Sequence, residues 1–399
     1  MTVTQPDVSV VIGAYEAMPY LVACLESVES QTIDPARIEV IAVDDGSTDG
    51  TGEYLEEFAA RAPMPVTVIR QENSGGPSGP RNMGLGKAAG RYVFFLDADD
   101  RLGTEALERM VAAADRNGTD VVLGRVEGIN RNPPKSMWDR TLERTDVYSS
   151  NIKFTLSAQK LFRRELLTRH GMRFDESLWT GEDALFTLEA YLRADGVSVI
   201  ADYTCYYLVG REDGKHVTKS GGYARRFDSA RALMGLITEM VPPGPRRDVL
   251  MVRPFVVTLL PQFGPKLLKD SEKVRRHKYE LAAPLLAAHW NEGVAQRLRV
   301  EERLRMHLLA TGQYERLLEV VRFSRAKKEP AALLEKRGRR VYLGYPYFRD
   351  AEAGIPDSVY LAEPREARRV PGYREGGTDY FMRRVLRKVR RMRRAPATR

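Results

Sequence analysis

The chain has 399 residues, with 63 Lys and Arg against 54 Asp and Glu, which gives a formal net charge of +9. This length predicts about two or three domains with a sizeable core. Cys24 and Cys205 are too few for a disulfide framework or a zinc site, so a reducing compartment is expected. The first residues do not resemble a secretion signal, and the apolar stretch 249–263 is too short and interrupted to span a bilayer. We therefore expect a cytoplasmic protein whose membrane contact is peripheral.

Short apolar runs alternate with helical patterns in the N-terminal part of the chain. The runs are rich in Val and Ile, which is typical of buried strands. Strand-like runs cover Val8–Ile12, Ile38–Val43, Val66–Ile69, Tyr92–Leu96 and Val121–Leu123, and helical patterns cover Pro19–Gln31, Thr51–Arg61 and Thr104–Arg116. The alternation predicts an α/β fold with a mainly parallel sheet flanked by helices. In such sheets ligands bind beyond the carboxyl ends of the strands.

The residue pattern of the sequence changes near Tyr223, where charged helical patterns begin. They cover Arg225–Met240, Val274–Trp290 and Glu301–Phe323, and a short aromatic, strand-like piece follows at Arg340–Phe348. We therefore expect an α/β domain at 1–221, a helical domain at 222–338, a short mixed segment at 339–380 and a basic tail at 381–399.

An acidic turn, Asp97-Ala98-Asp99-Asp100, directly follows one of the predicted strands. Carboxylates are natural ligands of Mg²⁺ or Mn²⁺, and a metal held by one or two of them keeps positions open for substrate phosphates. The turn thus indicates chemistry on a nucleotide-activated substrate. The alternative is that it caps the next helix, with Asp100 or Thr104 accepting backbone N–H groups. Taken alone, the motif supports both interpretations.

A second polar segment, Asp44 to Asp49, lies between a predicted strand and a predicted helix, at the same edge as Gly13-Ala14-Tyr15. Ser47 or Thr48 is expected to cap the helix, but a cap does not require Asp44. The Asp44 carboxylate can accept a hydrogen bond from the imide N–H of uracil, and the Tyr15 ring can stack on the base. These residues predict a nucleoside pocket.

The set of motifs resembles family 2 glycosyltransferases, which have the Rossmann-like GT-A fold. The resemblance rests on the order and spacing of Val8–Ile12, Val43–Asp49 and Phe95–Asp100, and it covers residues 1–221. Gly13-Ala14-Tyr15-Glu16 departs from the family's usual Pro-x-Tyr-Asn but keeps the tyrosine. The resemblance implies that the donor nucleotide is bound by Gly13, Tyr15, Asp44, Asp97 and Ala98, with Asp97 near the ribose and Asp99 on the metal.

The stretch from Asn73 to Gly84 is interpreted as a glycine-rich loop that ends in an Arg-Asn pair. It is similar to the family's Asn-x-Gly…Arg-Asn-x-Gly segment, which implies donor binding by Asn73 and Arg81. Glycines let the backbone approach a ligand closely, and an arginine can bind a nucleotide or position the acidic turn. The alternative is a bare surface loop.

The acidic pair Glu182-Asp183 opens an apolar helical run just after Trp179. It resembles the family's Glu-Asp motif, which implies that Asp183 is the catalytic base and Glu182 its catalytic neighbour, in contact with acceptor or donor sugar. A carboxylate that is partly desolvated and near a like charge has a raised proton affinity, as a general base requires. The alternative is an acidic helix N-terminus favoured by the dipole. The Trp179 ring either stacks on a sugar or simply packs against other side chains of the protein.

The basic segment from Tyr206 to Ser220 follows a strand-like run. It is similar to the closing loop of bacterial wall teichoic acid glycosyltransferases, where arginine and histidine reach the pyrophosphate. This implies donor binding by Arg211 and His216. For His216 the alternatives are a metal ligand or an exposed histidine with neither role. A loop that orders over the donor would exclude water and limit hydrolysis.

The tail at 381–399 is strongly basic and has an apolar stripe at helical spacing. The stripe consists of Phe381, Met382, Val385, Leu386, Val389 and Met392. A basic amphipathic helix binds an anionic membrane surface, which is the favoured interpretation. Nucleic-acid binding is the rival, although no nucleic-acid module accompanies the tail. A solvated disordered tail is the third alternative.

The favoured hypothesis is an inverting, metal-dependent glycosyltransferase at the inner face of the cell membrane. It would use a nucleotide sugar, in particular a UDP-sugar, with Mn²⁺ or Mg²⁺ as cofactor. The acceptor would be a cell-envelope polysaccharide, a teichoic acid or a lipid-linked saccharide, and the C-terminal parts would serve acceptor binding or formation of a homo-oligomer. The alternatives are a nucleotidyltransferase, which would carry a basic glycine-rich loop where this chain has residues 13–19, and a non-catalytic scaffold that binds a membrane or nucleic acid.

Overall fold

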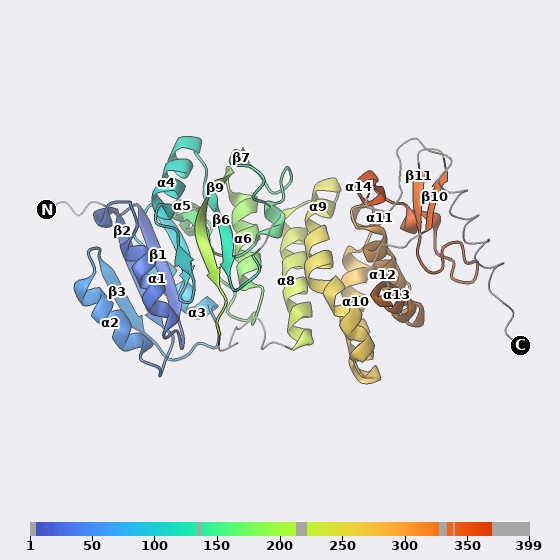
Figure 1. The fold of residues 1–399 in the computed structure, drawn as a ribbon, viewed down its shortest axis with the longest axis horizontal. Helices are drawn as coiled ribbons and strands as arrows, with labels where there is room; N and C mark the ends of the chain where they lie inside the picture. Colours follow the sequence, from blue (N-terminus) through green and yellow to red (C-terminus); the bar gives the residue numbers. More distant parts are fainter. Residues whose placement is uncertain (1–4, 134–136, 213–221, 327–332, 338–339, 369–399) are drawn as a thin grey trace, which may run out of the picture. The chain divides into compact units, whose positions relative to one another are not determined.

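The computed structural model describes residues 5–133, 137–212, 222–326, 333–337 and 340–368. The chain forms two compact units that divide between residues 242 and 243 (Figure 1). The first unit ends after helix α8 (Tyr223–Met240), because α8 packs on α6 (Glu182–Arg193). The boundary expected after residue 221 therefore lies one helix before the division in the structure.

The first unit is built on one nine-stranded sheet with the order β3-β2-β1-β4-β8-β6-β9-β5, and β7 pairs with β9. The strands are β1 Val8–Ala14, β2 Ile38–Asp44, β3 Val66–Arg70, β4 Tyr92–Asp97, β5 Arg101–Leu102, β6 Val121–Ile129, β7 Leu142–Thr145, β8 Leu161–Arg163 and β9 Val197–Val209. Strands β1 to β4 pair in parallel, as do β6 and β9, whereas β8 runs antiparallel between β4 and β6. The predicted α/β fold is confirmed, and the five predicted strands correspond to β1, β2, β3, β4 and β6.

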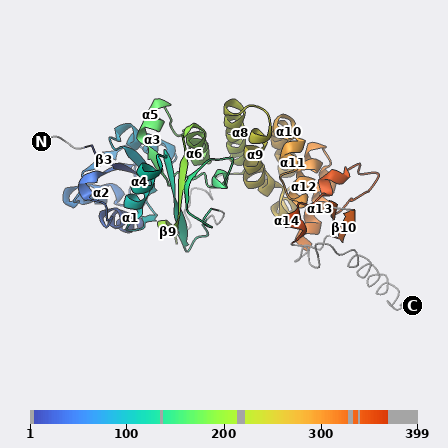
Figure 2. The same ribbon diagram turned by 90° about the horizontal axis from the view of Figure 1, so that it is seen from above.

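Helices cover both faces of this sheet (Figures 1 and 2). Besides α6 and α8 they are α1 Tyr20–Glu29, α2 Thr51–Arg61, α3 Ser78–Lys87, α4 Ala106–Asn117 and α5 Arg164–Arg169. Strand β1 shows the alternation, since Val8, Val10 and Ile12 belong to the core formed with α1, α2 and α4. Val11 points to the opposite face, where it lies against Gly84 of α3. Both faces of the strand are buried, as its continuous apolar run predicts.

An aromatic cluster holds α6 against the second face of the sheet. Phe95 of β4 makes edge-to-face contacts with Phe174 and Phe186, with ring centroids 5.0 and 5.7 Å apart. Phe174 and Phe186 stack on each other at 4.1 Å, and all three rings are buried. Such pairs add to the stabilisation from burial because edges and faces of aromatic rings attract each other. The first turn of α6, which carries Glu182 and Asp183, is thereby placed near the end of β4.

The second unit is helical with a small hairpin. Its described α-helices and strands are α9 Pro245–Arg253, α10 Glu272–His289, α11 Glu292–Ala295, α12 Val300–Ala310, α13 Tyr314–Ala326, α14 Pro364–Ala367, β10 Leu333–Arg337 and β11 Arg340–Gly344. The helix predicted over Glu301–Phe323 is two helices, because the chain turns at Gly312 with φ +69°. Among the described residues, none of the helices combines the length and the apolar character needed to cross a membrane.

Arg303 ties the helices of the second unit to the segment that follows the hairpin. It is buried, and its guanidinium donates to the carbonyl oxygens of Ala295, Ser358 and Leu361 at 2.7, 2.8 and 2.9 Å. Burial lowers its pKa. Carbonyl partners satisfy the donors that burial would otherwise leave without hydrogen bonds. Residues 358–361 therefore pack against the helices of this unit.

Candidate active site

The registers of three strands bring the predicted site residues to one edge. Gly13 on β1 lies opposite Asp97 on β4, and the next residue, Ala14, lies opposite Asp44 on β2. A Cβ on Gly13 would lie only 3.2 Å from the ring of Pro80, so glycine allows α3 to approach this edge closely. The edge is the carboxyl end of the parallel strands, where ligands bind in sheets of this type.

Arg81 joins the acidic turn to the Glu182-Asp183 pair. It is only 9% exposed, and its guanidinium lies 2.7 Å from Asp97 Oδ1 and 3.2 Å from Glu182 Oε1. Burial works against its charge, but Asp97 and Glu182 outweigh that effect and raise its pKa. A guanidinium that bridges two carboxylates fixes both in position through its planar donors. The acidic turn and the Glu182-Asp183 pair, which are distant in sequence, thus form one constellation.

The expected glycine-rich loop is shorter than the sequence suggested. Only its first part is loop, because α3 starts at Ser78 and carries Arg81 and Asn82 on its buried side. Pro80 is compatible with this start, since the first N–H groups of a helix have no partner within the helix. The prediction of a loop as far as Gly84 was wrong for this reason. Arg81 is consequently held by a helix rather than by a flexible segment.

Asp97 and Asp99 occupy the acidic turn at the end of β4. The second oxygen of Asp97 accepts a hydrogen bond from Gln159 at 2.7 Å. Burial and the neighbouring Asp97 raise the pKa of Asp99 to about 6, although Arg211 lowers it. The side chain of Ala98 is buried in the core, so this residue presents only its backbone to the edge.

Asp100 does not cap the following helix. It is fully buried, and its carboxylate accepts hydrogen bonds from the Tyr206 hydroxyl at 2.8 Å and from the Val209 N–H at 2.7 Å. Burial, Asp97 and Asp99 raise its pKa to about 8. The helix α4 begins at Ala106 with Glu105 at its cap position, so neither Asp100 nor Thr104 has the expected role. Asp100 instead ties the end of β9 to the acidic turn.

Asp44, which is expected to bind the nucleoside, is the last residue of β2. It is 2% exposed, accepts a hydrogen bond from the Ser47 N–H at 3.1 Å and lies 3.5 Å from Arg70 Nε. Tyr15 is 52% exposed, so its ring is accessible to a base. Helix α2 is not capped by Ser47 or Thr48, because the Asp49 carboxylate accepts from the Thr51 N–H at the helix start.

Asp45 organises the loop that contains Asn73, a role the sequence did not reveal. The buried Asp45 carboxylate accepts from Gln71 Nε2 at 2.6 Å and from the Ser74 N–H at 3.0 Å. Asn73 donates to the Asp45 carbonyl at 3.1 Å, so both ends of this loop are tied to the end of β2. Within the Asp44-Asp45 motif, the Asp44 carboxylate lies near Arg70, and the Asp45 carboxylate shapes the loop that contains Asn73.

Glu182 and Asp183 form the first turn of α6, which follows Gly181 with φ +89°. Glu182 is 6% exposed, and burial and Asp183 raise its pKa to about 7, although Arg81 lowers it. Asp183 is half-buried and accepts a hydrogen bond from the Ala184 N–H at 2.6 Å. The more accessible carboxylate of the pair is therefore Asp183.

Arg211 reaches the same edge from the end of β9. Its guanidinium donates to the Glu16 carbonyl at 2.9 Å and lies 5.1 Å from the centroid of the Tyr20 ring. The Glu212 N–H donates to the Tyr20 hydroxyl at 2.9 Å. The chain beyond β9 is thus attached to the turn after β1. His216, the other residue expected in the closing loop, lies outside the described residues.

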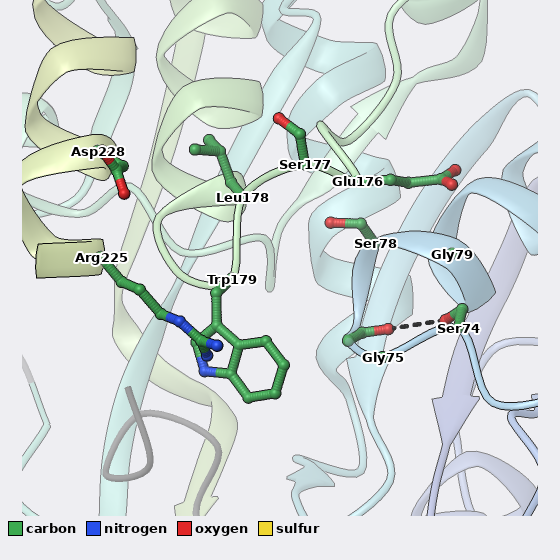
Figure 3. A pocket seen from close by; sticks show the side chains of 11 residues that line it. Ser74, Gly75, Ser78, Gly79, Glu176, Ser177, Leu178, Trp179, Arg225 and Asp228 are labelled. Carbon is green, nitrogen blue, oxygen red and sulfur yellow. Dashed lines mark hydrogen bonds between the residues drawn. The ribbon is translucent and has the colours of Figure 1, made fainter. Parts of the chain in front are cut away.

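A pocket of about 380 Å³ lies beside this constellation, within the first unit (Figure 3). It is lined by the loop that leads into α3, by the loop that leads into α6 and by the start of α8. The lining residues are Ser74, Gly75, Gly76, Ser78, Gly79, Glu176, Ser177, Leu178, Trp179, Arg225 and Asp228. The residues expected to hold the nucleotide and the metal do not line it.

The residues at the end of β4 suit a divalent cation. Asp97 and Asp99 offer oxygen donors, and burial together with the neighbouring Asp97 raises the pKa of Asp99, an effect that a bound cation would oppose. Within the described residues, three or more His, Cys, Asp or Glu side chains nowhere gather as in a closed metal site. A cation here would therefore take most of its ligands from substrate phosphates and water, as Mg²⁺ does in nucleotide sites.

Some contributors to the site carried no sequence signal. Gln159 comes from a loop without a motif, and only the fold brings it to Asp97. Tyr206 was part of the basic segment, but its hydroxyl turns inward to Asp100. Arg225 belonged to a predicted helix, and nothing in the helical pattern marked it as a pocket residue.

Two family models match the chain. Glycosyl transferase family 2 matches residues 9–171, and the Glycosyl transferase TarS linker domain matches residues 224–321. The poly(ribitol-phosphate) beta-glucosyltransferase of Bacillus spizizenii is 41% identical over 212 residues, which are 53% of this chain and 33% of that protein. The poly(ribitol-phosphate) beta-N-acetylglucosaminyltransferase TarS of Staphylococcus aureus is 37% identical, over 53% of this chain and 37% of its own length. The chain thus spans about a third of the length of these relatives.

A shorter relative and a solved structure extend this likeness. The poly(ribitol-phosphate) beta-N-acetylglucosaminyltransferase TarP of S. aureus is 33% identical, over 54% of this chain and 67% of its own length. The crystal structure of S. aureus TarS 1–349 in complex with UDP-GlcNAc has a TM-score of 0.76 and 27% identity, over 90% of this chain and 99% of that one. The predicted resemblance is confirmed: the chain belongs to glycosyltransferase family 2.

Proposed function

We propose that this protein is an inverting, metal-dependent glycosyltransferase that transfers a sugar from a UDP-sugar to a poly(ribitol phosphate) type of cell-envelope polymer. The observation that carries the proposal is the bridge from Asp97 through Arg81 to Glu182, with Asp183 as the next residue. This bridge supports the proposal because it joins the sheet edge that carries Asp97 and Asp99 to the helix start that carries the more accessible Asp183. The relatives' names specify the polymer, and the solved structure named above specifies UDP-GlcNAc.

In this proposal the two ends of the donor have separate partners. Tyr15 and Asp44 bind the base, Asp97 lies near the ribose, and Arg211 faces the diphosphate. A divalent cation held by Asp99 would neutralise charge on the departing diphosphate. Asp183 accepts the proton of the acceptor hydroxyl, which attacks the anomeric carbon from the face opposite the diphosphate and so inverts its configuration.

Asp183 suits the role of base better than Glu182. Glu182 is buried and lies 3.2 Å from Arg81, so its function is to hold Arg81 in place. Asp183 is half-buried at the start of α6, where an acceptor hydroxyl can reach it.

We further propose that the protein acts at the inner face of the cell membrane, as a peripheral protein. The support is the basic, amphipathic character of residues 381–399, which lie outside the described residues. Deletion of the residues after Tyr380 should weaken binding to anionic vesicles in a salt-dependent way. Unchanged vesicle binding would contradict this proposal.

The test of the transfer reaction is a UDP-release assay with a panel of nucleotide sugars, a ribitol-phosphate oligomer and either Mn²⁺ or EDTA. We expect UDP release with one UDP-sugar, and this release should need the divalent cation. In Asp183→Asn the rate of release should fall by at least about 10³-fold, as for loss of a catalytic base. Glu189→Gln is the matched control, because Glu189 lies on the same helix and pairs with Arg193. Release that persists in EDTA, or in Asp183→Asn, would refute the mechanism.

A further inference from the structure

The pocket beside Asp183 has the chemistry of an acceptor site. It is about 380 Å³ in size, within the range of roughly 300–1,000 Å³ that small-molecule pockets occupy. Its walls combine an aromatic ring, hydroxyl groups, carboxylates and glycine backbone, the groups that bind the hydroxyls of a polyol. The loop with Glu176 and Trp179 continues into Glu182 and Asp183, so a ligand in the pocket lies close to the candidate base.

Arg225 is a cation at the entrance of this pocket without a carboxylate partner in the described part of the chain. Its guanidinium lies over the Trp179 ring, 4.0 Å from the centroid, as Figure 3 shows. Its neighbour Asp228 pairs with Arg231 at 2.7 Å instead. A guanidinium that rests only on an aromatic face keeps its hydrogen-bond donors for an anionic ligand, and its fork geometry suits phosphate.

Trp179 has an unmet hydrogen-bond donor. Its indole Nε1 is buried and has no acceptor among the described residues. Buried donors almost always have a partner, and one that lacks it indicates a place where a ligand or water supplies the acceptor.

We propose that this pocket binds one polyol phosphodiester unit of the acceptor. Arg225 contacts the phosphate, Trp179 contacts the polyol, and the glycine and serine backbone of the loop before α3 lines the opposite wall. This inference rests on the proposed function. It extends that function by assigning the acceptor to a pocket that the candidate nucleotide residues do not line and whose Trp179 loop continues into Asp183.

The test measures binding to the full chain by isothermal titration calorimetry, with a short synthetic ribitol-phosphate oligomer and, separately, with UDP. We expect Arg225→Gln to weaken oligomer binding by about tenfold or more, as for loss of a charged hydrogen bond, and to leave the Kd of UDP unchanged. Trp179→Phe should also weaken oligomer binding, while Arg225→Lys keeps part of the affinity. Arg169→Gln is the control, because Arg169 is exposed on α5 and pairs with Glu165.

The unfavourable results would overturn different proposals or assignments. If the unaltered protein binds no UDP, the proposed function fails. If it binds UDP but not the oligomer, or if Arg225→Gln binds the oligomer normally, the acceptor site is overturned while the proposed function stands. A third titration uses the UDP-sugar that supports release; if Arg225→Gln weakens binding of this UDP-sugar but not of UDP, the pocket holds the donor sugar and the inference is also overturned. Circular dichroism and the thermal midpoint of each variant show that it is folded.

Discussion

The Tyr206 hydroxyl donates a hydrogen bond to the buried carboxylate of Asp100 at 2.8 Å, and it also accepts one from the Asp97 N–H at 3.3 Å. One hydroxyl group therefore links the long strand β9 to two residues of the acidic turn. Arg211 follows at the end of β9. The Tyr206 hydroxyl therefore helps to position Arg211, which faces the diphosphate in our proposal, relative to the acidic turn, which holds the metal.

Tyr206→Phe removes this link and keeps the ring. We expect the free energy of unfolding to fall by about 1–3 kcal/mol, because Asp100 stays buried with one donor fewer. Transfer should slow more than stability alone explains, since the acidic turn loses a constraint. Urea denaturation and UDP release measure the two effects. Tyr207→Phe, at the next and less buried residue of β9, is the control, and equal behaviour of the two variants would contradict the prediction.

Arg81→Lys keeps the positive charge but removes the planar fork. A lysine can contact Asp97 or Glu182 but cannot bridge them as the guanidinium does at 2.7 and 3.2 Å. We expect transfer to fall by about 10²-fold, because a small displacement of reacting groups has effects of this size. Steady-state kinetics of the variant measure this loss. Arg193→Lys, which changes a more exposed arginine paired with Glu189, should retain nearly full activity.

Glu182→Gln should alter how stability depends on pH. The native state holds the proton of Glu182 up to a pKa of about 7, whereas the ordinary value is 4.5. Between these values the native state binds more protons than the unfolded state, so the contribution of Glu182 to stability is lost as pH rises. Glutamine resembles the protonated form at every pH.

The unaltered protein and Glu182→Gln should therefore be similarly stable at about pH 5, and the unaltered protein should be less stable by about 2 kcal/mol at about pH 8. Urea denaturation over this range measures the difference between the two proteins. Glu189→Gln, a carboxylate change on the less buried side of α6, is the control. A difference between Glu182→Gln and the unaltered protein that stays constant with pH would show that the prediction is wrong.

Two glycines of α3 should respond in opposite directions to alanine. A Cβ on Gly84 would overlap Val11 Cγ1 of β1, whereas a Cβ on Gly86 meets nothing within 4 Å. Gly84→Ala should lower the free energy of unfolding by about 1–3 kcal/mol because α3 must shift away from the sheet. Gly86→Ala should raise it by up to about 1 kcal/mol, since alanine favours the helix.

Denaturant unfolding of both variants makes this comparison within one helix. If Gly84→Ala is as stable as Gly86→Ala, close packing of α3 on β1 is not required. Because α3 carries Arg81, the shift in Gly84→Ala should also reduce UDP release. Restoration of activity by a smaller residue at position 11, such as Val11→Ala, would show that the overlap is the cause.

The sequence by itself determined the α/β fold and the sheet edge at which several of the candidate site residues lie. Apolar runs such as Val8–Ile12 are strands because both of their faces are buried, and acidic residues that follow parallel strands must meet at one edge. The local pattern therefore placed Asp44, Asp97 and Asp99 together without a structure. It also identified Glu182-Asp183 as the start of a helix, because the apolar periodicity follows directly.

Only the tertiary structure decided which partner each carboxylate has. Asp100 looked like a helix cap, but the antiparallel pairing of β5 with β9 brings Tyr206 to it and makes it a buried link. Arg81 looked like a loop residue, but α3 places it between Asp97 and Glu182. Trp179 and Arg225 meet only because α8 packs on α6. Such contacts depend on packing between segments that are distant in sequence, and local patterns of hydrophobicity do not predict that packing.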